Sequence, residues 1–167
     1  GEPVIRKKAA RITDVRATKT KKIIRDLVDS MRFHQLVGMA APQIGVSKQI
    51  FVTEIRKTAT RKKLKQLDTV RVFINPRIIH ASKKQKIGYE GCGSVAQAQL
   101  FAQVSRPSWV VIEALDENGK PFRLEAQDLL ARIILHEYDH LQGRVFLDIV
   151  KNTRTILDRQ SYRALHL

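Results

Sequence analysis

Two histidines and a glutamate with the spacing of a metal site occur in residues 135–140. The segment reads LHEYDH, so that His136 and His140 are four residues apart. Four residues advance an α-helix by about 6 Å and return to the same face, which lets both imidazoles reach one metal ion. Glu137 projects from the same turn, where a carboxylate can move the protons of an activated water. The motif alone is also compatible with two solvent-facing histidines on an ordinary helix.

A third protein ligand is needed, because catalytic zinc-type sites usually have three and keep one position open. Downstream of the motif, the candidates Asp148, Asp158 and His166 lie in no recognisable ligand pattern. Upstream, the single cysteine, Cys92, lies between two glycines in the sequence EGCGS. A thiolate is a strong ligand for a divalent metal, and flanking glycines allow close approach of the backbone. Taken alone, a lone cysteine is more often a small buried apolar side chain.

A third segment, residues 36–45, is small and apolar and then presents one polar amide. It reads LVGMAAPQIG, and the amide belongs to Gln43. By itself this pattern indicates a core strand followed by a turn. Together with the histidine and cysteine segments, it favours a metal-dependent active site.

The metal motif falls in a predicted helix over residues 128–142. Apolar residues cover much of its circumference, and Gly143 is typical of a helix end. Such a helix should be central and buried, where histidines and a glutamate without partners would be costly. Two more helices are predicted, over residues 14–33 with Asp14 as N-cap and over residues 152–166.

Strands are predicted mainly ahead of the metal helix. A run of six Lys/Arg without an acid in residues 56–65 indicates an exposed loop or hairpin tip. The order of strands and then a helix indicates the α+β class, as a single domain over residues 1–167. We expect antiparallel strands packed around the central metal-binding helix, with an N-terminal and a C-terminal helix. The predicted strands cover residues 36–41, 49–55, 70–74 (interrupted by Pro76), 109–115 and 121–125.

Composition is consistent with one domain. The chain has 167 residues, 43% of them hydrophobic, enough for one core and too few for two. No run of about 18 apolar residues exists, so no membrane partner is expected, and no secretory signal is visible. One cysteine excludes an intrachain disulfide and fits a reducing compartment.

Positive charge is concentrated in the basic first half, residues 1–90. This half carries 22 Lys/Arg against 7 Asp/Glu, whereas residues 91–167 carry 9 of each, and the net charge is +15. Such a surface attracts polyanions such as RNA. A solvated basic face with no dedicated partner is an equally good interpretation.

The three segments together resemble the peptide deformylase family. Its signatures are Gly-φ-Gly-φ-Ala-Ala-Pro-Gln, Glu-Gly-Cys-φ-Ser and Gln-His-Glu-x-Asp-His, where φ is apolar. Here they read LVGMAAPQ, EGCGS and LHEYDH, in the family's order and at similar spacing. Residues 1–9 and 118–122 are also similar to the family, so the resemblance covers nearly the whole chain. Three ordered motifs are far more specific than any one of them.

The resemblance implies one divalent metal ion held by Cys92, His136 and His140, with water at the fourth position. Ferrous iron is the metal that family members typically use, and zinc or nickel often occupies the site in preparations. Glu137 would act first as general base and then as general acid.

The resemblance also implies how a substrate would be held. The side-chain amide of Gln43 and the backbone N–H of Gly93 would stabilise the oxyanion. Val37, Gly38 and Gly91 would pair by backbone with an extended peptide, and Leu129 and Ile133 would line a pocket for the methionine side chain.

The implied reaction removes the formyl group from the N-terminal formylmethionine of newly synthesised proteins and releases formate. The partners would be formylmethionyl nascent peptides, with a weak contact to the ribosome or its RNA through the basic first half. The expected location is the bacterial cytoplasm, or a mitochondrion or plastid if a targeting segment is missing. Two other functions stay open: a different His-Glu-x-x-His metallopeptidase, and a basic ribosome- or RNA-binding homologue with a decayed site.

This sequence departs from the family pattern at several positions near the motifs. Leu36 replaces a glycine, Gly93 an apolar residue and Leu135 a glutamine, and Ala96 stands where proline is common. The ligands and the base are retained, so these changes concern the shape of the pocket. Alternation along a strand places Leu36 on the same face as Gly38, which predicts that Leu36 points into or along the pocket rim. Packing into the core is the alternative.

Overall fold

The computed structural model describes residues 2–58 and 67–166. Within them a five-stranded antiparallel sheet has the order β1-β2-β3-β6-β7, and a three-stranded antiparallel sheet has the order β4-β5-β8. This is the predicted α+β domain. The strands are β1 (Gly38–Ala40), β2 (Ile50–Ile55), β3 (Asp68–Ala81), β4 (Gln85–Gly91), β5 (Leu100–Pro107), β6 (Trp109–Leu115), β7 (Pro121–Gln127) and β8 (Leu157–Asp158), and the helices are α1 (Thr18–Phe33), α2 (Asp128–Leu141) and α3 (Arg159–His166).

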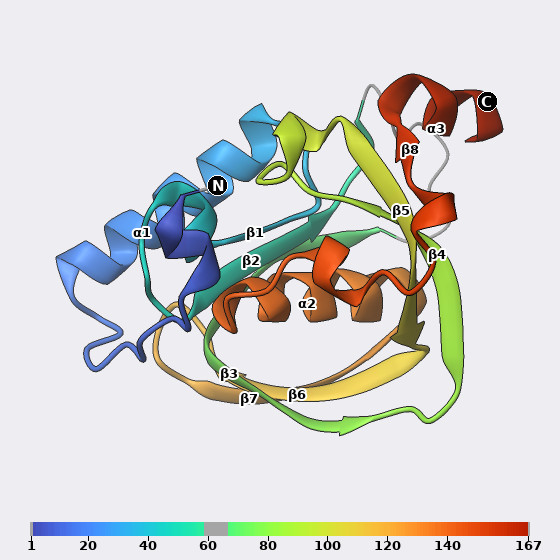
Figure 1. Cartoon of the computed structure of the whole chain (residues 1–167). Coiled ribbons are helices and arrows are strands. Elements are labelled where there is room, and N and C mark those ends of the chain that lie inside the picture. Colours follow the sequence, from blue (N-terminus) through green and yellow to red (C-terminus); the bar gives the residue numbers. More distant parts are fainter. Residues whose placement is uncertain (1, 59–66, 167) are drawn as a thin grey trace.

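The central position of α2 confirms the expectation from its apolar circumference. It lies in the middle of the fold, with the five-stranded sheet curving around it and the three-stranded sheet at its side (Figure 1). The helix ends before Gly143, which has φ +75° and donates its N–H to His140 O at 3.2 Å. A Cβ there would also lie 2.7 Å from Arg6 O, so glycine is required. Core residues around α2 are Phe51, Ile55, Phe73, Val110, Ile112, Leu130, Ile134 and Leu141.

Helix α1 begins four residues later than predicted. Asp14 Oδ1 accepts the N–H groups of Arg16 at 2.9 Å and Ala17 at 3.1 Å, which closes a turn ahead of the helix. The N-cap is Ala17, so the prediction that Asp14 caps the helix is wrong. The side chain makes the local backbone contacts of a turn instead. The predicted apolar face is buried, with Ile23, Leu27 and Met31.

Pro76 does not end the third strand, which corrects the prediction. β3 continues to Ala81, with a shift in its pairing with β6 between Ile74 and Arg77. Asn75 has φ +51°, and its side chain accepts from Ile12 N and donates to Ile12 O, both at 2.8 Å. A bulge therefore accommodates the residue that lacks an N–H donor.

The other predicted strands agree with the structure in position and differ at their ends. β1 is shorter than residues 36–41, because it begins only at Gly38 and Ala41 already belongs to a 3₁₀ turn, Ala41–Ile44. The predicted hairpin is β6–β7, and β7 runs two residues further than expected. Residues 59–65 of the predicted basic loop lie outside the described residues.

Three strands, β4, β5 and β8, were not predicted. β4 and β5 form a hairpin in which Gly91 pairs with Phe101 and Gln85 with Pro107. The helix predicted over residues 152–166 is wrong in its first half. That stretch forms a 3₁₀ turn, Thr153–Thr155, followed by β8, which pairs with β5.

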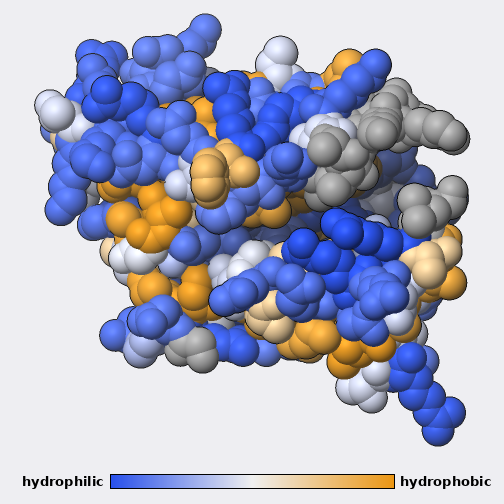
Figure 2. Space-filling view, turned by 90° about the horizontal axis from the view of Figure 1, so that it is seen from above, coloured by the Kyte–Doolittle hydropathy of each residue, from blue (hydrophilic) through white to orange (hydrophobic). Residues whose placement is uncertain are grey.

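The surface is largely polar. Figure 2 shows hydrophilic residues over most of the face seen from above, with apolar residues in separate groups between them. Among the described residues, none of the helices combines the length and the apolar character that crossing a membrane requires.

Candidate metal centre

The three predicted ligands come together. One ligand atom from each of Cys92, His136 and His140 lies within 4.8 Å of the others, and Cys92 Sγ is 3.3 Å from His140 Nε2. The cysteine follows directly on β4, and both histidines belong to one face of α2. Cys92 and His140 are buried and His136 is nearly so.

This donor set fits a single divalent transition metal. Thiolate and imidazole are the ligands that such ions prefer. His136 Nδ1 is 2.9 Å from Glu90 Oε2, which leaves Nε2 for a metal, and carboxylates hold ligating histidines in this way. Among the described residues His140 Nδ1 has no hydrogen-bond partner, although it is buried.

A buried charge cluster supports His136 from the hairpin side. Glu90 accepts two hydrogen bonds from Arg106, at 2.9 and 3.0 Å, and one from Arg132 at 2.7 Å. Arg106 also donates to Asp139 at 2.5 Å. Burial alone would raise the pKa of Glu90, but its bonds to His136 and Arg106 hold that pKa well below the usual range. The carboxylate facing His136 is therefore ionised.

The two imidazoles are electrostatically different. Burial lowers the pKa of His136, yet hydrogen bonds to Cys92 and Glu90 outweigh this and raise it to about 10. Burial and the charge of His136 lower the pKa of His140 to about 3. His136 therefore carries a proton at neutral pH that it must release to ligate a metal, whereas His140 is already neutral, the form of imidazole that ligates one.

Glu137 has the environment of an acid–base group. Its side chain is buried, and burial raises its pKa to about 7. A carboxyl with a pKa near neutrality can both accept and donate a proton at working pH. Its carboxylate lies against β1, where a Cβ on Gly38 would be 2.5 Å from Glu137 Oε1. Gly38 is therefore required for Glu137 to occupy this place.

A cavity of about 220 Å³ opens beside these groups, between the edge strands β1 and β4. Every predicted site residue except the buried His140 lines it. The structure thus brings together residues that are far apart in the sequence. The predicted residues on its wall are Leu36, Val37, Gly38, Gln43, Gly91, Cys92, Gly93, Leu129, Ile133, His136 and Glu137.

The Gln43 amide is directed into the site. Its oxygen accepts from Ala40 N at 2.7 Å, so its nitrogen faces Ser94 Oγ at 3.4 Å and Cys92 Sγ at 3.7 Å. The N–H groups of this amide are thus aimed toward the ligands. The hydrogen bond from Ala40 N to Gln43 Oε1 fixes this orientation of the amide.

Leu36 lies on the cavity wall and also packs on the core beside α1. It precedes β1, and Val37 lines the cavity as well, so strand alternation is not what places it there. Its Cδ1 would be 3.8 Å from a Cβ placed on Gly93. The Leu36 side chain therefore extends toward Gly93, the glycine that stands where the family has an apolar residue.

Sequence reasoning missed several wall residues. Arg132 donates to Lys86 O at 2.7 Å and Val104 O at 3.0 Å in addition to Glu90, which ties α2 to the hairpin. Of these missed residues, only Glu90 could have been recognised in the sequence, because it is the first residue of the EGCGS motif. The missed residues of the cavity wall are Tyr89, Glu90, Phe101, Arg132 and Tyr162.

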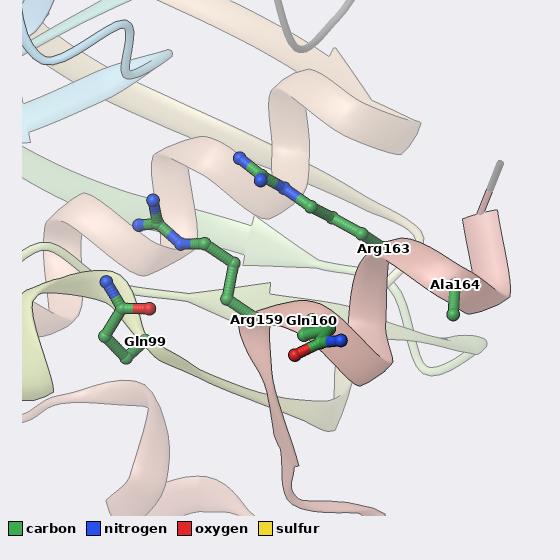
Figure 3. Close-up of a pocket in the computed structure, with 5 residues that line it drawn as sticks. All are labelled: Gln99, Arg159, Gln160, Arg163 and Ala164. Atoms are coloured by element: carbon green, nitrogen blue, oxygen red, sulfur yellow. The ribbon is translucent and has the colours of Figure 1, made fainter.

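A second hollow is lined by residues of α3 and by Gln99, just ahead of β5. Arg159 and Arg163 extend from the same side of that helix, one turn apart (Figure 3). The described residues of its lining include no histidine, cysteine or carboxylate, so the inner cavity is the candidate site. The residues around the hollow are Gln99, Arg159, Gln160, Arg163 and Ala164.

Known proteins match almost the entire chain. The family model described as polypeptide deformylase matches residues 1–155. A peptide deformylase of Pseudothermotoga lettingae is 39% identical, over 96% of this chain and 85% of its own, and one of Microchaete diplosiphon is 38% identical, over 96% and 81%. The crystal structure of a Synechococcus elongatus peptide deformylase with actinonin has a TM-score of 0.80 at 35% identity, covering 93% of this chain and 78% of that one. A Met-Ala-Ser-bound class I type b peptide deformylase from Acinetobacter baumannii has a TM-score of 0.83 at 28% identity, covering 90% and 94%.

Proposed function

The chain belongs to the polypeptide deformylase family, and from this premise we propose how its own residues remove the formyl group from the N-terminal formylmethionine of new proteins. The observation that carries the proposal is the meeting of one sulfur and two imidazoles beside the buried carboxylate of Glu137. A general metallopeptidase and a decayed RNA-binding homologue are disfavoured, because relatives over nearly the full length are peptide deformylases and the ligand set is intact.

We propose that Cys92, His136 and His140 hold one divalent metal ion, with ferrous iron as the native metal and zinc or nickel as substitutes in preparations. When bound, the metal would supply Lewis-acid chemistry, polarising a carbonyl oxygen and lowering the pKa of water. The contact between Glu90 and His136 would keep the imidazole oriented for this role.

Glu137 is assigned the proton transfers. Its carboxylate would take a proton from water as the water oxygen bonds to the formyl carbon. It would then give that proton to the amine nitrogen as the C–N bond breaks, so that formate and a free N-terminus leave. A pKa of about 7 suits both steps.

Two donors are assigned to the oxyanion that forms on the formyl oxygen. One is Gln43 Nε2, which already faces the ligands because Gln43 Oε1 is bound to Ala40 N. The other is the backbone N–H of Gly93, on the cavity wall. Donors held in place before the reaction stabilise developing charge at little cost of reorganisation.

The peptide is proposed to enter as an added strand between the two edge strands. β1 ends one sheet and β4 ends the other, and both border the cavity. Val37, Gly38 and Gly91 would make the backbone hydrogen bonds. Leu129 and Ile133, on the α2 side of the cavity, would contact the methionine side chain.

A contact with the ribosome is proposed for the basic first half, because a nascent chain is the substrate and this half carries the excess positive charge. Co-sedimentation with ribosomes should fall steeply between low and moderate salt. Binding that does not depend on salt would contradict the proposed contact. The proposed location is the bacterial cytoplasm, with a mitochondrion or plastid as the alternative.

Formate release from formyl-Met-Ala-Ser under anaerobic conditions tests the proposal. We expect release that depends on added divalent metal, with little or none from acetyl-Met-Ala-Ser, because the extra methyl must fit beside the metal. Casein cleavage without any formate release would instead identify a general peptidase.

A further inference from the structure

Three aromatic rings form one wall of the cavity that holds the candidate metal site. Tyr162 of α3 stacks on Phe101 of β5, with ring centroids 4.1 Å apart and an interplanar angle of 1°. Tyr162 also meets Tyr89 of β4 at a centroid distance of 5.5 Å. We call Tyr89, Phe101 and Tyr162 the aromatic wall, and all three line the cavity.

The aromatic wall lies on the face of β4 opposite to Glu90. Side chains alternate along a strand, so Tyr89 and Gly91 share one face and Glu90 has the other. Glu90 points toward Arg132 and His136 of α2. On the opposite face Phe101, paired with Gly91, would be only 2.6 Å from a Cβ placed on that glycine. The Phe101 ring therefore covers Gly91.

Several contacts tie the start of helix α3, which carries Tyr162, to β5 and the turn before it. β8 leads into the helix and pairs Leu157 with Phe101. Arg159 reaches back to Ala98 O, with hydrogen bonds of 2.8 and 3.0 Å, and Figure 3 shows its side chain extending from the start of the helix. Asp158 accepts the N–H and the hydroxyl of Ser161, each at 2.9 Å, which closes the first turn. Contacts within the chain therefore hold Tyr162 in the aromatic wall.

An added strand would present its side chains alternately to the two sides of the cleft. This step rests on the proposed function, in which the peptide pairs with Gly91 and the methionine side chain points toward Leu129 and Ile133 of α2. The next side chain must then point to the opposite face. That face, beside Gly91, carries the Phe101 ring with Tyr162 stacked on it.

We propose that the aromatic wall is a subsite for the side chain of the second residue of the peptide, and that it selects apolar and aromatic side chains. Aromatic rings offer a broad apolar surface and a favourable geometry for a further ring. Tyr162 is the specificity-determining residue, because it is supplied by a separate element and extends the surface beyond Phe101.

The test compares formyl-Met-Ala-Ser, formyl-Met-Leu-Ser and formyl-Met-Phe-Ser on the metal-loaded enzyme. We expect kcat/KM for the Phe peptide to exceed that for the Ala peptide by about tenfold, the scale of an aromatic contact. Tyr162→Ala should bring this ratio most of the way to one, and Tyr162→Phe should keep it. Leu165→Ala is the matched control, since Leu165 is on the same helix, 62% exposed and outside the cavity wall.

Binding of the product peptides Met-Phe-Ser and Met-Ala-Ser, measured by calorimetry, separates this inference from the proposed function. If no formyl peptide releases formate but Met-Phe-Ser still binds about tenfold more tightly in a Tyr162-dependent way, the proposed reaction fails and the subsite stands. Equal Phe-to-Ala ratios in the wild type and Tyr162→Ala would overturn the subsite. A Tyr162→Ala effect on the first residue rather than the second would overturn it equally.

Discussion

Helix α2 and the β4–β5 hairpin contribute to the same site in different ways. The helix supplies His136, Glu137 and His140, whose relation follows from helical spacing alone. The hairpin and the turn after it supply Glu90 and Cys92, whose partners on the helix lie 46 and 48 residues away. The spacing of residues within one helix can be read directly from the sequence. Contacts between segments that are distant in the sequence form only in the folded chain.

The two regions also bury their polar groups differently. Glu137 is buried, its Oε2 has no hydrogen-bond partner among the described residues, and burial keeps its pKa raised to about 7. Glu90 is equally buried, but Arg106, Arg132 and His136 compensate it and keep it ionised. Burial thus makes one carboxyl reactive, and the surrounding cations make the other a fixed support for His136.

The largest expected effect is a loss of activity without a loss of metal binding. Glu137→Gln should retain one metal per chain and lose activity by roughly 10²–10⁴-fold, because a positioned acid–base group is removed and no ligand is. Formate release and elemental analysis on the same preparation measure this. A near-native rate at full metal content would remove Glu137 from the mechanism.

On the hairpin side the corresponding change is Glu90→Gln. It removes one charge from a buried cluster and leaves Arg106 undercompensated, so the free energy of unfolding should fall by about 3–5 kcal/mol. Metal affinity should fall by roughly 10–100-fold as His136 loses its carboxylate. Urea denaturation and metal titration measure the two effects.

The same substitution in an exposed pair is the control. Glu113→Gln breaks the contact with Arg77, whose side chain is 74% exposed, and should cost less than about 1 kcal/mol. Similar losses for the two variants would mean that the Glu90 cluster is no stronger than a surface ion pair.

A smaller effect is expected at Leu36, on the β1 side of the cavity. Leu36→Gly should broaden tolerance for bulky first residues, with preferences shifting by about 1–3 kcal/mol. The measurement is kcat/KM for formyl-Met, formyl-norleucine and formyl-Phe peptides in both proteins. Unchanged ratios would show that Leu36 acts only in core packing, the other contact it makes.

A pair outside both regions gives another small effect, on stability rather than on activity. Hydrogen bonding by Arg32 lowers the pKa of Glu54 below its ordinary value of 4.5. The pair therefore stabilises the fold fully above pH 4.5 and loses its contribution as the pH falls through the lowered pKa. Because Arg32 is half exposed, Glu54→Gln should cost on the order of 1 kcal/mol at pH 7, and this difference should shrink in acid. Denaturation curves across pH would contradict this if the difference grew in acid.

Sequence patterns predicted the elements whose apolar residues follow a simple period. The face of α1, the β6–β7 hairpin and α2 with its ligands follow from such periods and from Gly143. The α+β class and the cavity residues were also predictable, the latter through resemblance to the family. A regular spacing of apolar residues predicts that one face of an element is buried, and each of these elements has such a face.

The β4–β5 hairpin escaped prediction because its buried positions include charged residues. Glu90 and Arg106 would be too costly to bury singly, and only their pairing in the folded chain makes the strands stable. Tyr162 was missed for a related reason: its contacts with Phe101 and Tyr89 join α3 to strands some 60 residues or more earlier in the chain. In the segment predicted as the start of the last helix, Thr153–Thr155 forms a 3₁₀ turn, and Leu157 and Asp158 pair with β5.

The central claim is that the helix and the hairpin jointly hold one metal ion. X-ray absorption at the metal edge of the active, metal-loaded protein tests it most directly, because sulfur and nitrogen neighbours are distinguishable by distance, at about 2.3 Å and 2.0–2.1 Å for zinc. The account predicts one sulfur and two imidazole nitrogens per metal. A first shell of nitrogen and oxygen only would contradict it, since Cys92 and with it the hairpin would then have no part in holding the metal.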